Sequence, residues 1–410
     1  AAVIDDVETH VLRDNYEQNV LLGVARVIGW QMISVHGRFV ASLEASGELD
    51  RAIEFLPTHK QFFDREETGE GLHSPELAVM AAYAKISLTQ QLENSSVPDE
   101  AWFQRELASY FPPLVVRRFA DLLPEHPLRR EIITTMIVNE MINKTGSTFI
   151  FRAVEETGAD PAVITRAYAA VREIFDLSGL WAAIEALDNT VPTAAQHAAY
   201  GVLRRLIDRA TRWLIETRYP VTDVATEVDR FTPTLRELAP HVSELLRGQA
   251  REFSAQDADR LVALGLPREL AERLAPLLYV FMLLDVVEIA DATGLPAAEV
   301  ADLHFALYDR FSIDRLLTKI TDLPRGDRWS TLARGAIRHD AYAALSAITS
   351  AIIRGSSPGV TAAERTQTWE EANADRVARI RGTAREALAR DHVDLATLSV
   401  ALRVLRTLPN

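Results

Sequence analysis

The chain has 410 residues and a formal net charge of −14; 48% of its residues are hydrophobic and none is cysteine. The absence of cysteine excludes a disulfide framework, a thiolate zinc site and a cysteine nucleophile. The acidic balance argues against a nucleic-acid surface or an anionic membrane surface, because phosphate binding needs concentrated positive charge. Glycine and proline, at 18 each, are too few for an all-β protein that turns every roughly 8–12 residues.

The two ends and the apolar stretches bear on what kind of chain this is. It begins with Ala1 rather than methionine, and no basic segment followed by an apolar run indicates a signal peptide. We therefore expect that an N-terminal part was removed or that the chain is one segment of a longer protein. The longest apolar stretch, from Leu274 to Leu284, is shorter than the roughly 18–20 residues of a membrane span. We expect a soluble, cytoplasmic protein with no membrane partner.

Lysine is rare in this chain, and arginine supplies nearly all of the positive charge. We interpret this preference as codon bias from a GC-rich genome rather than as an arginine-based function. The lysines are Lys60, Lys85, Lys144 and Lys319.

Apolar residues recur with the period of an α-helix along nearly the whole chain, which predicts an all-α fold. One face of the first helix carries Val3, Ile4, Val7 and Val11. From Val20 to Val35 only Arg26 is charged, so we expect this helix to be buried on several sides. Residues 57–72 break the pattern and predict a long, partly exposed loop. Ser74 as N-cap and Pro75 at the first helical position predict that the next helix starts there.

The rest of the chain continues the helical pattern, and no run alternates apolar and polar residues as a strand would. We therefore predict an extended multi-helix array or bundle. Further helices are predicted from Leu128 to a stop at Gly146, from Asp160-Pro161 to Phe175, from Leu180 to Leu187, from Thr193 to Thr217, from Phe231 to Leu246, from Ala275 to Ala290, from Pro296 to Arg310, from Ile313 to Ile320 and from Arg376 to Leu405.

A faint internal repeat indicates two related helical modules. Glu156-Thr157-Gly158 precedes Ile174-Phe175-Asp176 and then an apolar helix, while Ala292-Thr293-Gly294 precedes Leu307-Tyr308-Asp309 and a similar helix, with a gap of three residues. Duplication would produce this spacing. A chance match between two amphipathic helices is the alternative.

The ten histidines show no metal-ligand spacing. Glu70-Gly71-Leu72-His73 is a single Glu-x-x-His in a predicted loop, whereas a di-iron bundle needs this motif twice on helices. His339-Asp340 is the dipeptide of all-α metal-dependent phosphohydrolases, but no separated ligands accompany it, so we interpret the two residues as polar side chains on the surface. Asp5-Asp6-Val7-Glu8-Thr9 lacks the last aspartate of a DDxxD motif and indicates a solvated face.

Two glycine motifs also fail as catalytic or coenzyme sites. Gly355-Ser356-Ser357-Pro358-Gly359 matches G-x-S-x-G, but a nucleophile elbow needs a strand before the serine, and a helix is predicted there; we expect an interhelical linker. Gly69-Glu70-Gly71 is the only Gly-x-Gly and lacks the strand and helix of a dinucleotide site. We interpret the tryptophans as packing anchors: Trp30, Trp102, Trp181, Trp213, Trp329 and Trp369.

Eight or more ordered motifs nevertheless resemble one family. They are Leu12-Arg13-Asp14-Asn15-Tyr16-Glu17-Gln18-Asn19, His73 through Ile86, Tyr110-Phe111-Pro112, Leu128 through Ile133, Asn139 through Phe149, Glu155-Glu156-Thr157-Gly158-Ala159, Leu180-Trp181 with Ile184 and Ala186 through Asn189, and Arg212-Trp213-Leu214. In this order they resemble the C-terminal region of the large bacterial NAD-specific glutamate dehydrogenases. The resemblance is densest from about residue 10 to 215 and thins after about 340.

The resemblance implies a parent chain that oxidatively deaminates L-glutamate to 2-oxoglutarate and ammonia while reducing NAD. It places the catalytic lysine and aspartate and the glycine-rich coenzyme turn upstream of this region. No motif here matches them, so we predict no catalytic, cofactor-binding or metal-ligating residue in this segment, and no cofactor bound by it. The expected partners are the catalytic core of the same chain and further copies in a homo-oligomer.

We expect three regions on this basis. Residues 1–56 are helices that continue from the upstream catalytic core, residues 73–218 are a first helical module, and residues 219–410 are a second module with the C-terminal helices. The helix up to about Glu44 is expected to pack on the catalytic core. A free-standing helical adaptor that binds a protein partner is the alternative function, and an all-α metal enzyme around His339-Asp340 is a third.

Overall fold

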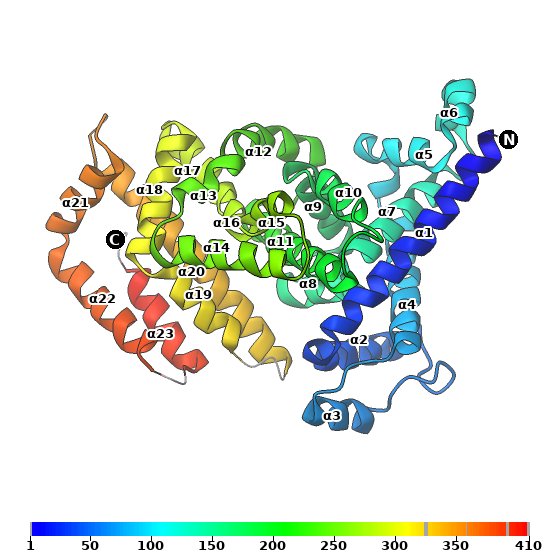
Figure 1. Cartoon of the computed structure of the whole chain (residues 1–410), viewed down its shortest axis with the longest axis horizontal. Helices are drawn as coiled ribbons and strands as arrows, with labels where there is room; N and C mark the ends of the chain where they lie inside the picture. The colour runs from blue at the N-terminus through cyan, green and yellow to red at the C-terminus, as the bar shows by residue number, and fades with distance from the viewer. Residues whose placement is uncertain (1, 324–326, 358, 391–392, 408–410) are drawn as a thin grey trace. The chain divides into compact units, whose positions relative to one another are not determined.

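The computed structural model describes residues 2–323, 327–357, 359–390 and 393–407 (Figure 1). All regular secondary structure in these ranges is helical and none is strand, which confirms the predicted all-α class. The chain divides into two compact units, Ala1–Val228 and Asp229–Asn410. The expected division of residues 1–56 from 73–218 stays a prediction.

The first unit contains most of the long helices. They are α1 (Ala2–Val27), η1 (Gly29–Met32), α2 (Ile33–Ala45), α3 (His59–Thr68), α4 (Ser74–Glu93), η2 (Val97–Asp99), η3 (Ala101–Phe103), α5 (Gln104–Tyr110), α6 (Pro113–Phe119), η4 (Ala120–Glu125), α7 (Arg129–Thr145), α8 (Phe149–Thr157), α9 (Pro161–Ile174), α10 (Leu177–Glu185) and α11 (Thr193–Arg218). The unit boundary falls within α12 (Val224–Leu238).

The second unit is built from shorter helices and one long one. They are η5 (Ala239–His241), α13 (Val242–Leu245), α14 (Gly248–Ala263), α15 (Arg268–Leu274), α16 (Leu277–Val280), α17 (Leu283–Thr293), α18 (Ala297–Arg310), α19 (Ile313–Asp322), α20 (Arg328–Arg354), α21 (Ala362–Ala372), α22 (Ala374–Leu388) and α23 (Leu395–Leu405).

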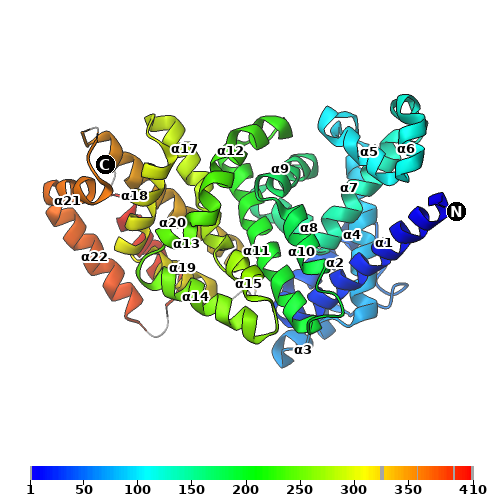
Figure 2. The same ribbon diagram turned by 45° about the horizontal axis from the view of Figure 1, so that its top comes forward.

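Each unit has one long helix at the centre of its core. In the first unit α11 packs against α1, α7, α8, α9 and α10, and both views show α9 and α10 beside it (Figures 1 and 2). Leu206, Ile207 and Leu214 of α11 are completely buried. In the second unit α20 packs against α17, α18, α19, α21 and α23 and buries Leu345 and Ile348. The predicted helix from Thr193 to Thr217 is thus confirmed, and its apolar stripe is the reason for its central place.

Several predicted boundaries are also confirmed, because local capping specifies them. Helix α7 ends where Gly146 adopts φ 102°, and Asp160 caps α9 by accepting a hydrogen bond from Ala162 N at 2.8 Å. Helices α18 and α19 agree with the predicted helices from Pro296 and Ile313.

The prediction of a loop over residues 57–72 is wrong, because α3 occupies most of it. Thr58 and Gln61 form a capping box: Gln61 N donates to Thr58 Oγ1 and Thr58 N donates to Gln61 Oε1. Phe62 is the only buried residue of α3, and Gly69 closes it in a left-handed conformation. A helix anchored by one apolar residue carries almost no periodic signal. The next helix, α4, begins at Ser74, so that His73 rather than Ser74 is its N-cap.

Three other predicted helices are broken. Pro240 lies in η5 and ends α12 at Leu238, which divides the predicted helix from Phe231 to Leu246. The predicted helix from Ala275 to Ala290 is divided into α16 and α17, and the tail from Arg376 to Leu405 into α22 and α23.

The apolar segment from Val20 to Val35 is not one buried helix. Helix α1 ends at Val27, η1 turns the chain, and α2 begins at Ile33. Leu21 and Val24 are buried, but Val27 and Trp30 are more than half exposed. Among the described residues no single helix is long and apolar enough to cross a membrane; the bent pair Val3–Val27 and Gly29–Ala45, which meet at 82°, passes by length and composition alone.

The six tryptophans differ in burial, and Trp102 and Trp369 are intermediate. Trp181 and Trp213 are buried anchors, as predicted, whereas Trp30 and Trp329 are exposed, at 54% and 73%, so the packing interpretation is wrong for these two.

The two units contain the same local arrangement. In the first, α8 ends at Gly158 (φ 68°), the 14-residue α9 follows, and Asp176 (φ 46°) turns the chain into α10. In the second, α17 ends at Gly294 (φ 73°), the 14-residue α18 follows, and Ser312 (φ 52°) turns the chain into α19. The same interval separates Gly158 from Gly294 and Asp176 from Ser312. The repeat therefore needs no gap: Asp176 corresponds to Ser312, not to Asp309 as the sequence comparison had it.

Candidate functional site

A buried polar group in the first unit surrounds Lys144, at the C-terminal end of α7. Its side chain is only 7% exposed, and its Nζ lies 3.1 Å from Glu17 Oε1 of α1 and 2.8 Å from Glu185 Oε1 of α10. The ammonium also lies 5.2 Å from the centre of the Trp181 ring, within cation–π range. One ammonium therefore joins three helices. We call Glu17, Lys144, Trp181 and Glu185 the Lys144 cluster.

A cavity of about 10 Å³ adjoins the Lys144 cluster. Its walls are Tyr16, Glu17, Val20, Asn143, Lys144, Glu185, Tyr200 and Arg204. Asn143 Oδ1 is buried there without a hydrogen-bond donor, while Arg204 donates to the carbonyl oxygens of Lys144 and Asn143 at 3.0 and 3.3 Å. The volume accommodates about one water molecule and is far too small for an amino acid or a dinucleotide.

Burial dominates the electrostatics of this cavity. It raises the pKa of Tyr200, an effect that Tyr16 and Glu185 reinforce, and it also raises the pKa of Tyr16, with Asp188 adding to the shift. Burial lowers the pKa of Arg204 to about 10, although Asp208 opposes the shift. At neutral pH both tyrosines are therefore neutral hydrogen-bonding groups, and the cavity holds no ionised nucleophile from them.

A second buried group lies around Asp208 of α11. Arg152 of α8 forms a bidentate pair with it, at 2.6 and 2.9 Å, and Arg212 contacts it at 3.3 Å while also pairing with Glu156. Burial raises the pKa of Asp208, but Arg152 and Arg212 outweigh burial and hold that pKa well below its usual range. This group fastens α8 to α11.

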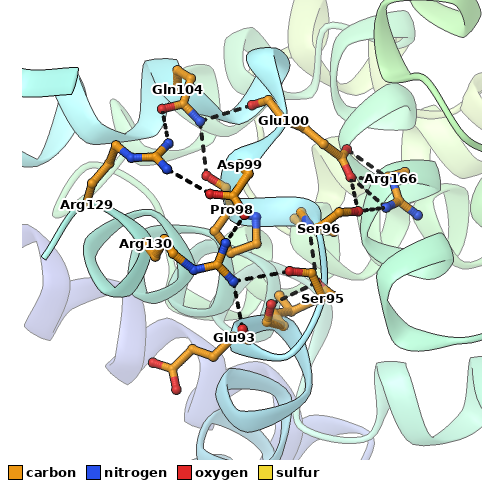
Figure 3. A network of polar contacts seen from close by, with 12 residues as sticks. Glu93, Ser95, Ser96, Pro98, Asp99, Glu100, Gln104, Arg129, Arg130 and Arg166 are labelled. Carbon is orange, nitrogen blue, oxygen red and sulfur yellow. Dashed lines mark hydrogen bonds and ion pairs between the residues drawn. The ribbon is translucent and has the colours of Figure 1, made fainter. Parts of the chain in front are cut away.

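A third group links α7 and α9 to the segment between α4 and α5, and Figure 3 shows it at close range. Arg129 donates to Asp99 Oδ1 at 2.7 Å, and Arg130 contacts the other oxygen of Asp99 and donates to Glu93 O at 2.8 Å. Arg166 of α9 pairs with Glu100 at 2.6 Å. The guanidinium groups are directed inward to carboxylates and backbone carbonyls, an arrangement that holds a loop in place.

Several residues of the motifs from the sequence analysis belong to these three groups. Glu17, Lys144 and Trp181 come from three different motifs that the sequence analysis singled out, and Glu156 and Arg212 come from two more. Two pairs join motifs to one another: Lys144 with Glu17, and Arg212 with Glu156. The signal that sequence reasoning missed was Lys144 itself, since in a chain so rich in arginine a buried lysine indicates a place where a compact ammonium with three donors is needed.

The residues weighed as metal or catalytic motifs lie apart from these groups. Glu70 to His73 connect α3 to α4 outside any helix, as predicted. His339 and Asp340 lie on α20, where Asp340 Oδ1 accepts a hydrogen bond from Arg406 at 3.0 Å. Gly355 to Gly359 connect α20 to α21 as the predicted linker; Pro358 lies outside the described residues. In the part of the chain that the structure describes, no three His, Asp or Glu residues are placed to hold a metal ion.

An open polar hollow of about 330 Å³ lies between the end of α11 and the start of α12. Its two carboxylates are engaged: Glu227 pairs with Arg218 at 3.3 Å, and Asp223 accepts hydrogen bonds from Thr226. These contacts stabilise the start of α12.

Comparison with known proteins agrees with the motifs. Residues 69–407 match the family described as Glutamate dehydrogenase, C-terminal. The chain belongs to this family. It is 39% identical over 405 residues to a NAD-specific glutamate dehydrogenase of Mycobacterium tuberculosis and 36% identical over 404 residues to one of Pseudomonas aeruginosa. A NAD-specific glutamate dehydrogenase of Halomonas elongata is 33% identical over 369 residues.

The matched length shows which part of the relatives this chain corresponds to. The alignments cover 99%, 98% and 90% of this chain but only 25%, 25% and 23% of the three relatives. The chain thus spans about a quarter of the length of the curated relatives it matches, and it corresponds to a C-terminal region of a large enzyme.

Proposed function

We propose that this segment is the helical C-terminal part of a large bacterial NAD-dependent glutamate dehydrogenase. The full-length chain would convert L-glutamate to 2-oxoglutarate and ammonia in the cytoplasm, with NAD bound and reduced upstream. The observation that carries the proposal is the alignment of almost the entire chain with a quarter of three enzymes of that name. The buried, mutually paired charges support a structural role, because Lys144, Asp208 and their partners join helices of the first unit to one another.

The role we propose for the segment is to brace the catalytic core and to provide contacts between subunits of a homo-oligomer. The distribution of exposed apolar side chains supports this role. Among the described residues with large, exposed apolar side chains, only Trp329, Leu395 and Val400 belong to the second unit, and all others belong to the first. An apolar surface concentrated on one unit is typical of a docking face.

The test is to express the family-length enzyme, meaning a full-length member of this family that contains this segment, as two separate chains. One chain ends immediately before residue 1 of this segment, and the other is this segment. We expect them to copurify, and we expect the upstream chain alone to lose assembly mass in light scattering and to change its kcat or KM for glutamate. An upstream chain with unchanged mass and unchanged kinetics would contradict the bracing role. Full-length protein without glutamate-dependent NAD reduction would contradict the activity and favour a helical adaptor.

A further inference from the structure

We propose that the N-terminal half of α1, together with α6 and η4, is the surface on which the preceding part of the same chain packs. This inference rests on the proposed function and assigns residues to it. We call the surface the N-terminal apolar surface. Its residues are Ile4, Val7, Val11, Leu12, Leu114, Phe119 and Leu122, each more than 40% exposed.

The first half of α1 is helical but hardly packed. None of residues 3–15 is buried, whereas Leu21 and Val24 in the second half each retain 2% exposure. With about 100° of rotation per residue, Ile4, Val7 and Val11 share one stripe, which lies about 100° round the helix from the stripe of Leu21 and Val24. The exposed stripe therefore points away from the core that the second half of the helix contacts.

Helix α6 is unpacked in the same way. It has no buried residue, and it exposes Leu114 and Phe119, while η4 after it exposes Leu122 at 60%. The structure brings α6 into contact with α1, and both views show it beside the N-terminal half of that helix (Figures 1 and 2). Two neighbouring helices thus both present apolar side chains to the outside.

A partner that buries this surface would stabilise the N-terminal half of α1. The stripe on α1 consists of β-branched residues, which have low helix propensity, and isolated helices of this length are marginal in water. A partner that buries the stripe supplies the stabilisation that this part of α1 lacks within the segment. Exposed apolar side chains grouped on adjacent elements are also unusual on a surface that faces only water.

The occupant we infer is the upstream part of the same polypeptide. The relatives carry about three quarters of their length outside the region matched here, and in a family-length chain the preceding residues join this segment at the start of α1. A tethered partner is present at an effective concentration on the order of millimolar, an advantage that a second copy of the chain does not have. The position of the surface beside the first helix therefore favours packing within one chain.

The absence of cysteine from this segment allows a direct test. Val7→Cys and Leu122→Cys each introduce one thiol on the N-terminal apolar surface, and Val400→Cys, 57% exposed on α23, is the matched control. The rate of maleimide labelling at each site is measured by peptide mass spectrometry, in the active family-length enzyme and in the 410-residue chain. We expect Val7→Cys and Leu122→Cys to react at least about tenfold more slowly in the family-length enzyme, with the Val400→Cys rate unchanged.

Equal labelling rates for Val7→Cys in the two proteins would overturn the proposal. Protection that is already present in the 410-residue chain and grows with its concentration would also overturn it, in favour of a second copy as the occupant. Glutamate-dependent NAD reduction is measured on the same family-length variants. An active enzyme with fully reactive thiols would refute this surface and leave the proposed function standing, whereas an inactive wild-type enzyme would refute the proposed function itself.

Discussion

Lys144 Nζ lies 2.8 Å from Glu185 Oε1, and the same nitrogen lies 3.1 Å from Glu17 Oε1. A single buried ammonium thus forms ion pairs with carboxylates from two helices that are far apart in the sequence. Because α1 contributes Glu17, this contact fixes the well-packed half of α1 to α7 and α10. The orientation of the exposed half of the same helix follows from it.

Removing the ammonium leaves two poorly solvated carboxylates whose shared cation is the exposed Arg13, at 3.4 Å from Glu17 and 3.9 Å from Glu185. We expect Lys144→Met to destabilise the first unit by about 3 kcal/mol, the typical cost of breaking a buried ion pair. The midpoint of urea unfolding, followed by circular dichroism, measures the loss. The control is Arg268→Met in the exposed pairs with Asp259 and Glu272, for which we expect a much smaller shift of the unfolding midpoint. Equal shifts for the two variants would disprove the importance of burial here.

The buried histidine of the second unit should make stability depend on pH. Burial lowers the pKa of His304 to about 3, and its Nδ1 lies 3.0 Å from Thr349 Oγ1. Because histidine has a pKa of about 6.5 in an unfolded chain, only the unfolded state binds the proton below that pH. The contribution of neutral His304 is complete above pH 6.5 and declines as the pH falls, by roughly 1.4 kcal/mol per unit.

The measurement is the free energy of unfolding between pH 7 and pH 4. His304→Gln keeps a neutral hydrogen-bonding side chain, so we expect it to flatten the pH dependence. The same substitution at the exposed His241 should leave the dependence unaltered. A parent protein and a His304→Gln variant with the same slope would contradict this assignment.

Asp208 should matter most at neutral pH. With its pKa held low by Arg152 and Arg212, its ionised form stabilises the fold above the ordinary carboxyl pKa of about 3.9, and this contribution declines as the pH falls below that value. We expect Asp208→Asn to cost about 3 kcal/mol at pH 7 and progressively less toward pH 2. Asp257→Asn, in the exposed pair with Arg260, serves as the control. A stability difference between parent and Asp208→Asn that stays constant with pH would rule out this role of Asp208.

Two glycines should respond in opposite ways to the same substitution. A Cβ on Gly71 would lie 2.7 Å from the carbonyl carbon of Gly29 and 2.8 Å from Trp30 N, both of them backbone atoms, whereas a Cβ on Gly201 within α11 meets nothing within 4 Å. We expect Gly71→Ala to lower the melting temperature and Gly201→Ala to raise it, the latter by up to about 1 kcal/mol in stability. Thermal unfolding of both variants tests this, and a stabilised Gly71→Ala would show that the two backbones are not in close contact.

The sequence correctly predicted the helices whose position depends on local features, such as an apolar stripe or a capping residue. Helix α11 has a long apolar stripe and α9 has Asp160 as its cap, so both could be placed from the residues alone. Helix α3 could not, because its stability comes from one capping box and the single buried Phe62. The Lys144 cluster could not be assembled either, since Lys144 and Glu185 are 41 positions apart and only the packing of α7 against α10 and α11 brings them together. Pairing between distant charges has no periodicity that a sequence displays.

The left-handed residues Asp176 and Ser312 have a consequence for how such a chain can change over time. Each joins a 14-residue helix to a shorter one through the same backbone turn, after a left-handed glycine at the same distance upstream. The same turn thus forms although Asp176 in one helix pair corresponds to Ser312 in the other, while Phe175 and Phe311, Leu180 and Leu316, and Ile184 and Ile320 are the same residue types at corresponding positions. A helix pair of this kind can keep its backbone while the residues on its surface change. A chimera in which the two helix pairs are exchanged would show whether each unit folds with the backbone of the other pair. A loss of stability in the chimera would indicate that the surface residues of each pair are specific to its own unit.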